Sequence, residues 1–236
     1  MYVFDAPKQA SVAVQGSDDR FPVRRIFCVG RNYEAHAREM GKDPTRESPF
    51  FFTKPADAVM DTPCTMPYPK LTEDLHYEIE LVIAIGKGGD HIAEEDVMDH
   101  IWGAAVGLDM TRRDLQAEAK EAGRPWDWAK AFDNSAPIGP IRPIEKVKSL
   151  EAGRIWLAIH KEGETMAEMR QDADLSDLIW SVREHIAILS QAMTLAPGDL
   201  IMTGTPAGVG AAVPGDKITG GVEGVGGLEV NIGPRP

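Results

Sequence analysis

The ten residues from His76 to Ile85 constrain the fold more than any other stretch of the chain. They read HYEIELVIAI and run into the turn-forming Gly86-Lys87-Gly88-Gly89, a pattern of β-branched and aliphatic residues that predicts one β-strand. Because successive side chains of a strand point to opposite faces, Glu78 and Glu80 share a face. Two carboxylates on an otherwise apolar face are costly, since burial and mutual repulsion both disfavour their charged forms.

A divalent cation held between Glu78 and Glu80 would remove that cost. Carboxylate oxygens are the ligands that hard cations such as Mg²⁺ prefer in proteins. An edge strand with one solvated face also accounts for a Glu-x-Glu pair, and this alternative stays open on the pair alone. The metal interpretation therefore depends on finding further ligands and a catalytic base elsewhere in the chain.

The composition narrows the class of partner. The net charge of −12 over 236 residues argues against nucleic acid or an anionic membrane surface as a partner. The N-terminus lacks a signal-peptide pattern, and no apolar run is long enough to span a bilayer. The two cysteines, Cys28 and Cys64, have no metal-like spacing, and their sparseness fits a reducing compartment. We therefore expect a cytoplasmic protein with a small-molecule substrate.

The chain is predicted to hold one substantial domain. Residues 1–22 are expected to form an irregular lead-in with at most one short strand, and residues 23–236 a single catalytic domain. Apolar runs predict further strands, and helix-forming or capping patterns predict helices. The expected strands are Val23–Val29, Phe50–Lys54, Trp102–Leu108, Ile155–Ile159 and Leu200–Thr203; the expected helices are Asp96–Ile101, Met110–Gly123 and the segment that follows a capping box at Ser181–Glu184.

Asp109 is the first candidate for a further metal ligand. It stands at the start of the predicted helix Met110–Gly123, where a carboxylate can cap amides or hold a metal ion. Arg113 and Gln116 share a helix face with Asp109 and form a polar row suited to a carboxylate or a ketone. An ordinary solvated helix face is the alternative interpretation.

A candidate base and a candidate buried cation complete the set. His36 and Glu39 are three residues apart on a predicted helical turn, and a carboxylate beside an imidazole makes it a better general base. On spacing alone, a surface histidine near a glutamate is the better interpretation. Lys130 lies among Trp126, Trp128 and Phe132, so it is either a surface lysine with a buried stem or a buried cation that serves an anionic site.

Five motifs in order along the chain resemble one family. They are Arg31-Asn32-Tyr33 with His36 and Glu39, His76 to Glu80, Asp109 to Gln116, Ala129 to Phe132, and Thr203 to Gly210. This set resembles the fumarylacetoacetate hydrolase family, in particular its single-domain acylpyruvate hydrolases, which include fumarylpyruvate hydrolases. The resemblance runs from about Val23 to the C-terminus.

The resemblance implies an α+β fold that is mainly β, a mixed β-sandwich roll with a few short helices, and usually a homodimer. It implies Mg²⁺ or Mn²⁺ at Glu78, Glu80 and Asp109, with His36 and Glu39 activating water. It also implies a substrate-binding set that comprises Arg31, Tyr33, Arg113, Gln116 and Thr205. Lys130 is expected to be catalytic, holding the substrate and stabilising the enolate that leaves.

The activity that the resemblance implies is metal-dependent hydrolysis of a carbon–carbon bond in an acylpyruvate. Fumarylpyruvate, cleaved to fumarate and pyruvate in the catabolism of aromatic compounds, is the first candidate. The fumarylacetoacetate enzymes carry an additional aspartate ligand where this chain has about Val29, which argues against fumarylacetoacetate as substrate. A fumaryl group brings a second carboxylate, for which Arg31, Arg38 and Arg112 are candidate partners.

A lyase is the rival from another reaction class. The same metal and Lys130 would stabilise the enolate formed when oxaloacetate loses CO₂, with no attack by water. Related isomerases and decarboxylases of 2-oxo acids also stay open, because a fold does not fix a reaction.

Overall fold

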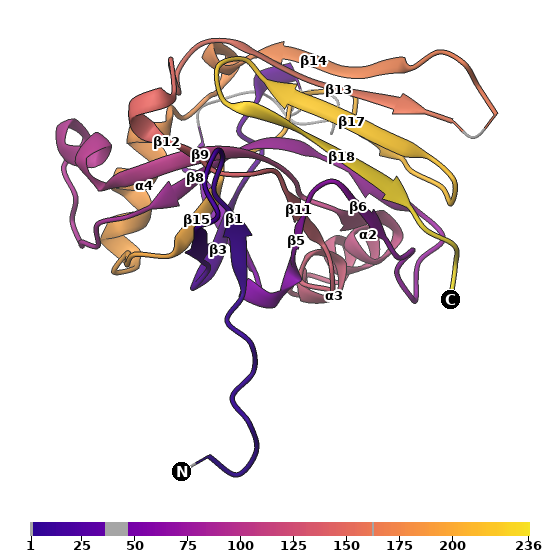
Figure 1. Cartoon of the computed structure of the whole chain (residues 1–236), viewed down its shortest axis with the longest axis horizontal. Helices are drawn as coiled ribbons and strands as arrows, with labels where there is room; N and C mark the ends of the chain where they lie inside the picture. Colours follow the sequence, from indigo (N-terminus) through magenta and orange to yellow (C-terminus); the bar gives the residue numbers. More distant parts are fainter. Residues whose placement is uncertain (1, 36–46, 162) are drawn as a thin grey trace.

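Two curved β-sheets, packed face to face, form the body of the molecule (Figure 1). The computed structural model describes residues 2–35, 47–161 and 163–236. The structure is mainly β with few helices, as the sequence predicted. The larger sheet follows the order β4 (Phe50–Lys54), β3 (Arg25–Gly30), β15 (Asp199–Met202), β8 (Ile79–Ile85), β9 (Ile101–Leu108), β11 (Ala136–Ile138) and β5 (Val59–Asp61), with β12 (Arg142–Pro143) paired to β9.

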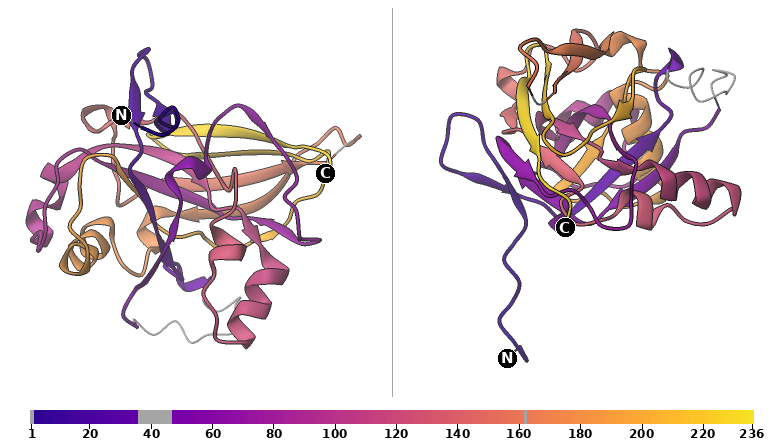
Figure 2. Two further views of the ribbon diagram at one scale, coloured as in Figure 1. Left: turned by 90° about the horizontal axis from the view of Figure 1, so that it is seen from below. Right: turned by 90° about the vertical axis from the view of Figure 1, so that its right-hand side faces the viewer.

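The second sheet covers one face of the larger sheet and lies at the top of Figure 1. Its order is β14 (Glu168–Asp174), β13 (Arg154–His160), β17 (Lys217–Val222), β18 (Gly226–Ile232) and β6 (Cys64–Met66). A small third sheet joins β10 (Thr111–Arg112), β7 (Leu75–Tyr77) and β16 (Gly210–Ala211). Figure 2 shows the two large layers from below and from the side.

The helices are short and lie around the sheets. They are α2 (Arg113–Glu121), α3 (Asp127–Lys130) and α4 (Val182–Ala192), with 3₁₀ turns η1 (Ala56–Ala58), η2 (Glu94–His100), η3 (Ile144–Lys146) and η4 (Leu175–Asp177). The capping box predicted at Ser181 is confirmed, because each of Ser181 and Glu184 accepts a hydrogen bond from the other's backbone amide. Within the described residues, no helix is long and apolar enough to cross a membrane.

Strand β8 is the centre of the larger sheet and is buried on both faces. It pairs antiparallel with β9 and with β15, and β15 pairs parallel with β3, so the sheet is mixed as expected. Leu81 and Ile83 pack into the core cluster shared with the second sheet, whereas Val82 and Ala84 pack into a cluster on the opposite face. Full burial of one such side chain stabilises the fold by about 1.5–3 kcal/mol.

The predicted strand from His76 to Ile85 is in fact two strands, and this expectation was wrong. The chain leaves the larger sheet at Glu78, where β7 turns away to pair with β10 and β16. Its neighbour β9 departs at the same level, and the Asp109 amide donates to the Glu78 carbonyl oxygen over 2.9 Å. Because both strands leave the larger sheet at this level, Glu78 and Asp109 lie side by side where the larger sheet meets the small third sheet.

The helix expected from Met110 begins later, at Arg113. Thr111 and Arg112 pair instead with His76 and Leu75 in the small sheet. Tertiary strand pairing thus overrides the helix propensity of the first residues. Asp109 therefore lies at the end of a strand rather than at the N-terminus of the helix.

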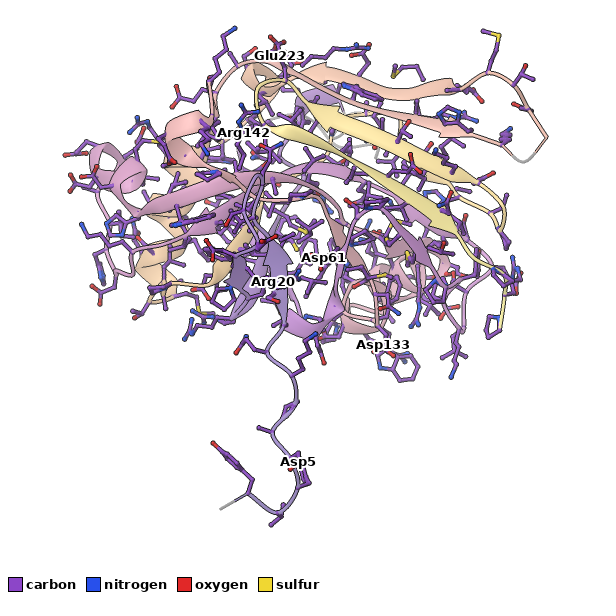
Figure 3. The ribbon with its side chains drawn as sticks, viewed as in Figure 1. Asp5, Arg20, Asp61, Asp133, Arg142 and Glu223 are labelled. Carbon is purple, nitrogen blue, oxygen red and sulfur yellow. The ribbon has the colours of Figure 1, made fainter. Side chains whose placement is uncertain are left out.

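The lead-in is more ordered than predicted. It forms two strands, β1 (Ser11–Ala13) and β2 (Arg20–Pro22), and Val12 and Phe21 pack into the core cluster on the outer face of β8. Arg20 is ion-paired with Asp61 over 2.6 Å, and the two lie together in Figure 3. The residues before β1 extend away from the body, with Asp5 far from any sheet (Figure 3).

Replacing Leu81 by Ala is expected to lower the free energy of unfolding by about 2–5 kcal/mol, because the side chain is fully buried in the core between the sheets. Urea unfolding measures this loss. The control is Val213→Ala at a half-exposed position, which should change the same quantity by less than about 0.5 kcal/mol. Equal effects of the two substitutions would contradict the assignment of Leu81 to the core.

Candidate active site

Three buried carboxylates meet where the paired strands β8 and β9 leave the larger sheet. Glu80 lies on β8, Glu78 in the break between β7 and β8, and Asp109 directly after β9. One oxygen from each lies within 4.8 Å of the others, and all three side chains are buried. The structure thus brings together the three residues that the sequence singled out as metal ligands.

The surroundings of Glu80 disfavour its charged form. Burial, followed by the negative charges of Asp109 and Glu78, raises the pKa of Glu80 well above its usual value. The amide of Gly204 donates to Oε2 of Glu80 over 2.7 Å and offsets part of this cost. Gly204 has φ of +102°, and a Cβ there would lie 2.7 Å from the Cβ of Asn32, so only glycine fits.

Lys130 is a buried cation rather than a surface lysine. Its Nζ donates to Oε2 of Glu78 over 2.8 Å and to Oδ2 of Asp109 over 2.6 Å. Burial alone would lower the pKa of Lys130, but the charges of Asp109 and Glu78 outweigh it and hold the pKa above its usual value. The ammonium also lies 5.1 Å from the centre of the Phe52 ring.

Lys54 is a second buried cation, which the sequence reasoning missed. Its Nζ lies 2.8 Å from Oδ1 of Asp109 and donates to the carbonyl oxygens of Met110 and Lys130. It therefore fixes both Asp109 and the end of α3. The only signal in the sequence is a lysine that ends the apolar strand Phe50–Lys54, since a fully buried lysine needs an anionic partner.

Arg113 links the carboxylates to a row of polar side chains. Its guanidinium donates to Oε1 of Glu78 and to Oε1 of Gln116, and its Nε donates to Nδ1 of His76 over 3.3 Å. Nε2 of His76 therefore carries the ring proton and donates to Asp74 over 2.8 Å. Burial, with the charge of Arg113, lowers the pKa of His76, which keeps the ring neutral near pH 7.

Gln171 connects the site to the second sheet and was also missed. Its amide nitrogen donates to Oγ1 of Thr205 over 2.8 Å and to the Pro206 carbonyl oxygen over 2.7 Å. Its oxygen accepts from the amide of Ile79 over 3.1 Å. Because Gln171 is fully buried, these bonds hold the Thr205 hydroxyl in one place. No motif marks Gln171, which meets Thr205 only through the packing of the sheets.

A pocket opens over the carboxylates. Within the described part of the chain, it is lined by every predicted site residue except Tyr33 and Arg112. Val29 lines it too and adds no carboxylate to the three. Tyr33 is buried and lines a neighbouring hollow with Asp177 and Pro206 instead.

Arg112 and three residues outside the described ranges complete the set of predicted site residues. His36, Arg38 and Glu39 lie outside the described residues, so their roles stay predictions. Arg112 is described but does not line the pocket, because its guanidinium lies 4.3 Å from the centre of the Phe132 ring and donates to the Trp128 carbonyl oxygen.

The donor set fits a hard divalent cation. Three carboxylates supply only oxygen ligands, which suits Mg²⁺ or Mn²⁺ rather than a metal that prefers thiolates. The raised pKa of Glu80 shows that the charged triad is costly despite Lys130, Lys54 and Arg113. A bound divalent cation would offset that cost.

Comparison with known proteins agrees with this geometry. The family model "Fumarylacetoacetate (FAA) hydrolase C-terminal" matches residues 25–232. A fumarylpyruvate hydrolase from Ralstonia sp is 45% identical over 192 residues, which cover 81% of this chain and 96% of the relative. The mitochondrial oxaloacetate tautomerase FAHD1 of Rattus norvegicus is 39% identical over 202 residues, covering 86% and 88%.

A solved structure is similar over almost the whole chain. It is the crystal structure of a fumarylpyruvate hydrolase from Pseudomonas aeruginosa in complex with Mn²⁺ and pyruvate. The two chains superpose with a TM-score of 0.94 and 50% sequence identity, over 99% of each. The superposed region includes the whole fold and the strands that position the carboxylates.

The pH dependence of stability tests the buried triad. Because the pKa of Glu80 is raised, folded metal-free protein keeps a proton above about pH 4.3, where an unfolded glutamate releases it. The free energy of unfolding should therefore fall as the pH rises above that value, and Glu80→Gln should make the fall shallower. Urea unfolding in chelator between pH 5 and 8 measures both slopes.

The control for this comparison is Glu118→Gln, at an exposed position on α2. It should leave the slope of the wild type unchanged. Mn²⁺ titration by calorimetry gives a second readout, in which Glu80→Gln should weaken binding by about 100-fold or more. A slope and an affinity equal to those of the wild type would contradict the role of Glu80.

Proposed function

This chain belongs to the fumarylacetoacetate hydrolase family and is a hydrolase of carbon–carbon bonds, and we propose that it cleaves fumarylpyruvate to fumarate and pyruvate. The observation that carries the proposal is one pocket that holds three buried carboxylates together with Lys130. The Pseudomonas aeruginosa enzyme, which is alike over its whole length, holds Mn²⁺ and pyruvate.

The pocket residues have separate tasks in this proposal. Glu78, Glu80 and Asp109 would hold Mg²⁺ or Mn²⁺, which when bound supplies a Lewis acid for the 2-oxo acid end of the substrate. Arg113 and Gln116 supply donors for the carboxylate and oxo groups of the pyruvyl part. Thr205, held by Gln171, adds a hydroxyl, and its position is fixed before substrate arrives.

The reaction needs a proton acceptor and a site for developing charge. His36, oriented by Glu39, is proposed to take a proton from water, and the resulting hydroxide attacks the distal carbonyl carbon. The bond from that carbon to the pyruvyl methylene breaks, and its electron pair leaves as the pyruvate enolate. The buried ammonium of Lys130 stabilises this negative charge, and protonation of the enolate carbon gives pyruvate.

Tautomerisation of oxaloacetate is the second candidate, because the oxaloacetate tautomerase FAHD1 of Rattus norvegicus is 39% identical over 86% of this chain. Oxaloacetate is also a 2-oxo acid, and its keto–enol interconversion moves a proton without attack by water. The decarboxylation of oxaloacetate uses the same Lys130 and stays a further prediction. Both alternatives leave His36 without a water to activate.

Three narrower properties remain predictions. They are Mg²⁺ as the native cation in place of Mn²⁺, assembly as a homodimer, and a cytoplasmic location. The Mn²⁺ in the Pseudomonas aeruginosa structure supports a divalent cation without distinguishing between the two metals.

Product analysis tests the proposed reaction. Fumarylpyruvate, acetylpyruvate and oxaloacetate are each offered to the purified protein with Mg²⁺ and again after chelation. We expect chelator-sensitive release of pyruvate and fumarate, fastest from fumarylpyruvate. Fast loss of CO₂ or fast enol–keto exchange from oxaloacetate, with slow cleavage of both acylpyruvates, would contradict the proposal.

Replacing His36 by Ala should lower kcat for fumarylpyruvate by about 100- to 10,000-fold, because the general base is lost. Mn²⁺ affinity should stay at the wild-type value, since His36 is not among the proposed ligands. His160→Ala removes a histidine that lies outside the pocket and should leave both quantities unchanged. Full hydrolysis by the His36 variant would remove it from the mechanism.

A further inference from the structure

The cations of the pocket fall into two groups. Lys54, Lys130 and Arg113 are each paired with a carboxylate of the triad. Arg31 and Lys120 line the same pocket. Neither makes a hydrogen bond or an ion pair with any residue that the structure describes. Among the residues that the structure describes, no carboxylate is hydrogen-bonded or ion-paired to either of these two cations.

Aromatic rings hold these two cations in place. The guanidinium of Arg31 lies 5.4 Å from the centre of the Phe50 ring, and Nζ of Lys120 lies 5.1 Å from that of the Trp126 ring. Phe50 and Trp126 contact each other edge to face at 5.4 Å. The two cations thus lie over one continuous aromatic surface, which Phe50 and Trp126 form and Phe52 extends.

The backbone under Arg31 is shaped for this arrangement. A Cβ at Gly30 would lie 2.1 Å from the Phe50 ring, so glycine is required for that ring to lie against the chain. Arg31 itself has φ of +59°, in the left-handed region that non-glycine residues seldom adopt. Backbone strain of this kind is found at functional sites, where it fixes the direction of a side chain.

The environment of Lys120 favours an anion. Burial, with the positive charges of Arg113 and Arg31, lowers the pKa of Lys120 to about 8. The site therefore repels its own cation in the absence of a ligand, and a bound carboxylate would relieve the repulsion. Of the cations on the predicted helix, Arg113 and Lys120 line the pocket, whereas Arg112 does not.

We propose that Lys120, together with Arg31, binds a second carboxylate at the acyl end of the substrate. This inference rests on the proposed acylpyruvate cleavage and deepens it. Its substrate class is the dianionic acylpyruvates, with the 2-oxo acid over the triad and the far carboxylate between the two cations. A planar unsaturated acyl chain such as fumaryl would lie along the aromatic surface between them. Lys120 is then the residue that distinguishes fumarylpyruvate from acetylpyruvate.

A pair of ligands that cannot be hydrolysed tests the subsite apart from catalysis. 2-Oxoheptanedioate and 2-oxoheptanoate have the chain length of fumarylpyruvate and differ only in a terminal carboxylate or methyl group. Calorimetry with Mn²⁺ present measures both affinities for the wild type and for Lys120→Met. The wild type should prefer the dianion by about 10- to 100-fold, as expected for a charge-assisted hydrogen bond. Lys120→Met should lose most of that preference, and Lys120→Arg should keep part of it.

Arg124→Met is the matched control, because Arg124 is an exposed cation four residues further along. It should keep the wild-type preference for the dianion. Kinetics on fumarylpyruvate and acetylpyruvate give the second readout, in which Lys120→Met should lower kcat/KM about 10-fold or more for fumarylpyruvate alone.

The two readouts separate the subsite from the reaction. Equal affinity of the wild type for the two ligands, or an unchanged preference in Lys120→Met, would overturn the subsite. An equal kinetic loss on both acylpyruvates would do the same, because a structural or general role would then explain it. A dianion preference that depends on Lys120, in a protein that cleaves neither acylpyruvate, would support the subsite and refute the proposed reaction.

Discussion

The burial of three carboxylates at one point is the constraint on which the rest of the site depends. Glu78, Glu80 and Asp109 lie where water cannot stabilise their charges, and isolated buried charges cost several kcal/mol each. Lys54 and Lys130 offset part of this cost through short ion pairs, and each is itself unable to stay buried without its carboxylate partner. The raised pKa of Glu80 indicates that the compensation is incomplete. A divalent cation would complete it, and metal binding would then be coupled to the local fold.

The carboxylates come together where the chain passes between the larger sheet and the small third sheet. Strands β8 and β9 leave the larger sheet at the same level, which places Glu78 beside Asp109 and leaves Glu80 two residue pairs further into the sheet. The second sheet reaches the same point through Gln171, whose three hydrogen bonds join β14, β8 and the loop at Thr205. Groups on the larger sheet and on the second sheet thus fix the positions of the polar atoms before any ligand binds, which is the condition for electrostatic catalysis.

The carboxylates were predicted from local strand alternation, and the class of fold from resemblance to a family. Strand alternation places Glu78 and Glu80 together, and order along the chain identifies the family motifs. The break at Glu78 and the late start of α2 were not predictable in this way, since each follows from pairing with a strand distant in sequence. Lys54 and Gln171 were missed for the same reason, because their partners are defined only by how the sheets pack. Lys120 was not singled out from the sequence, and only the structure shows that it lines the pocket.

Crystals soaked with Mn²⁺ and pyruvate would test the central claim most directly, by anomalous diffraction at the manganese edge. The account predicts one strong anomalous peak bound by oxygens of Glu78, Glu80 and Asp109, at the roughly 2.0–2.6 Å usual for hard cations and oxygen. It also predicts pyruvate in the same pocket, within hydrogen-bonding distance of Lys130 or Arg113. A peak elsewhere, or none at a manganese concentration that supports activity, would contradict the claim that the buried carboxylates exist to hold a metal.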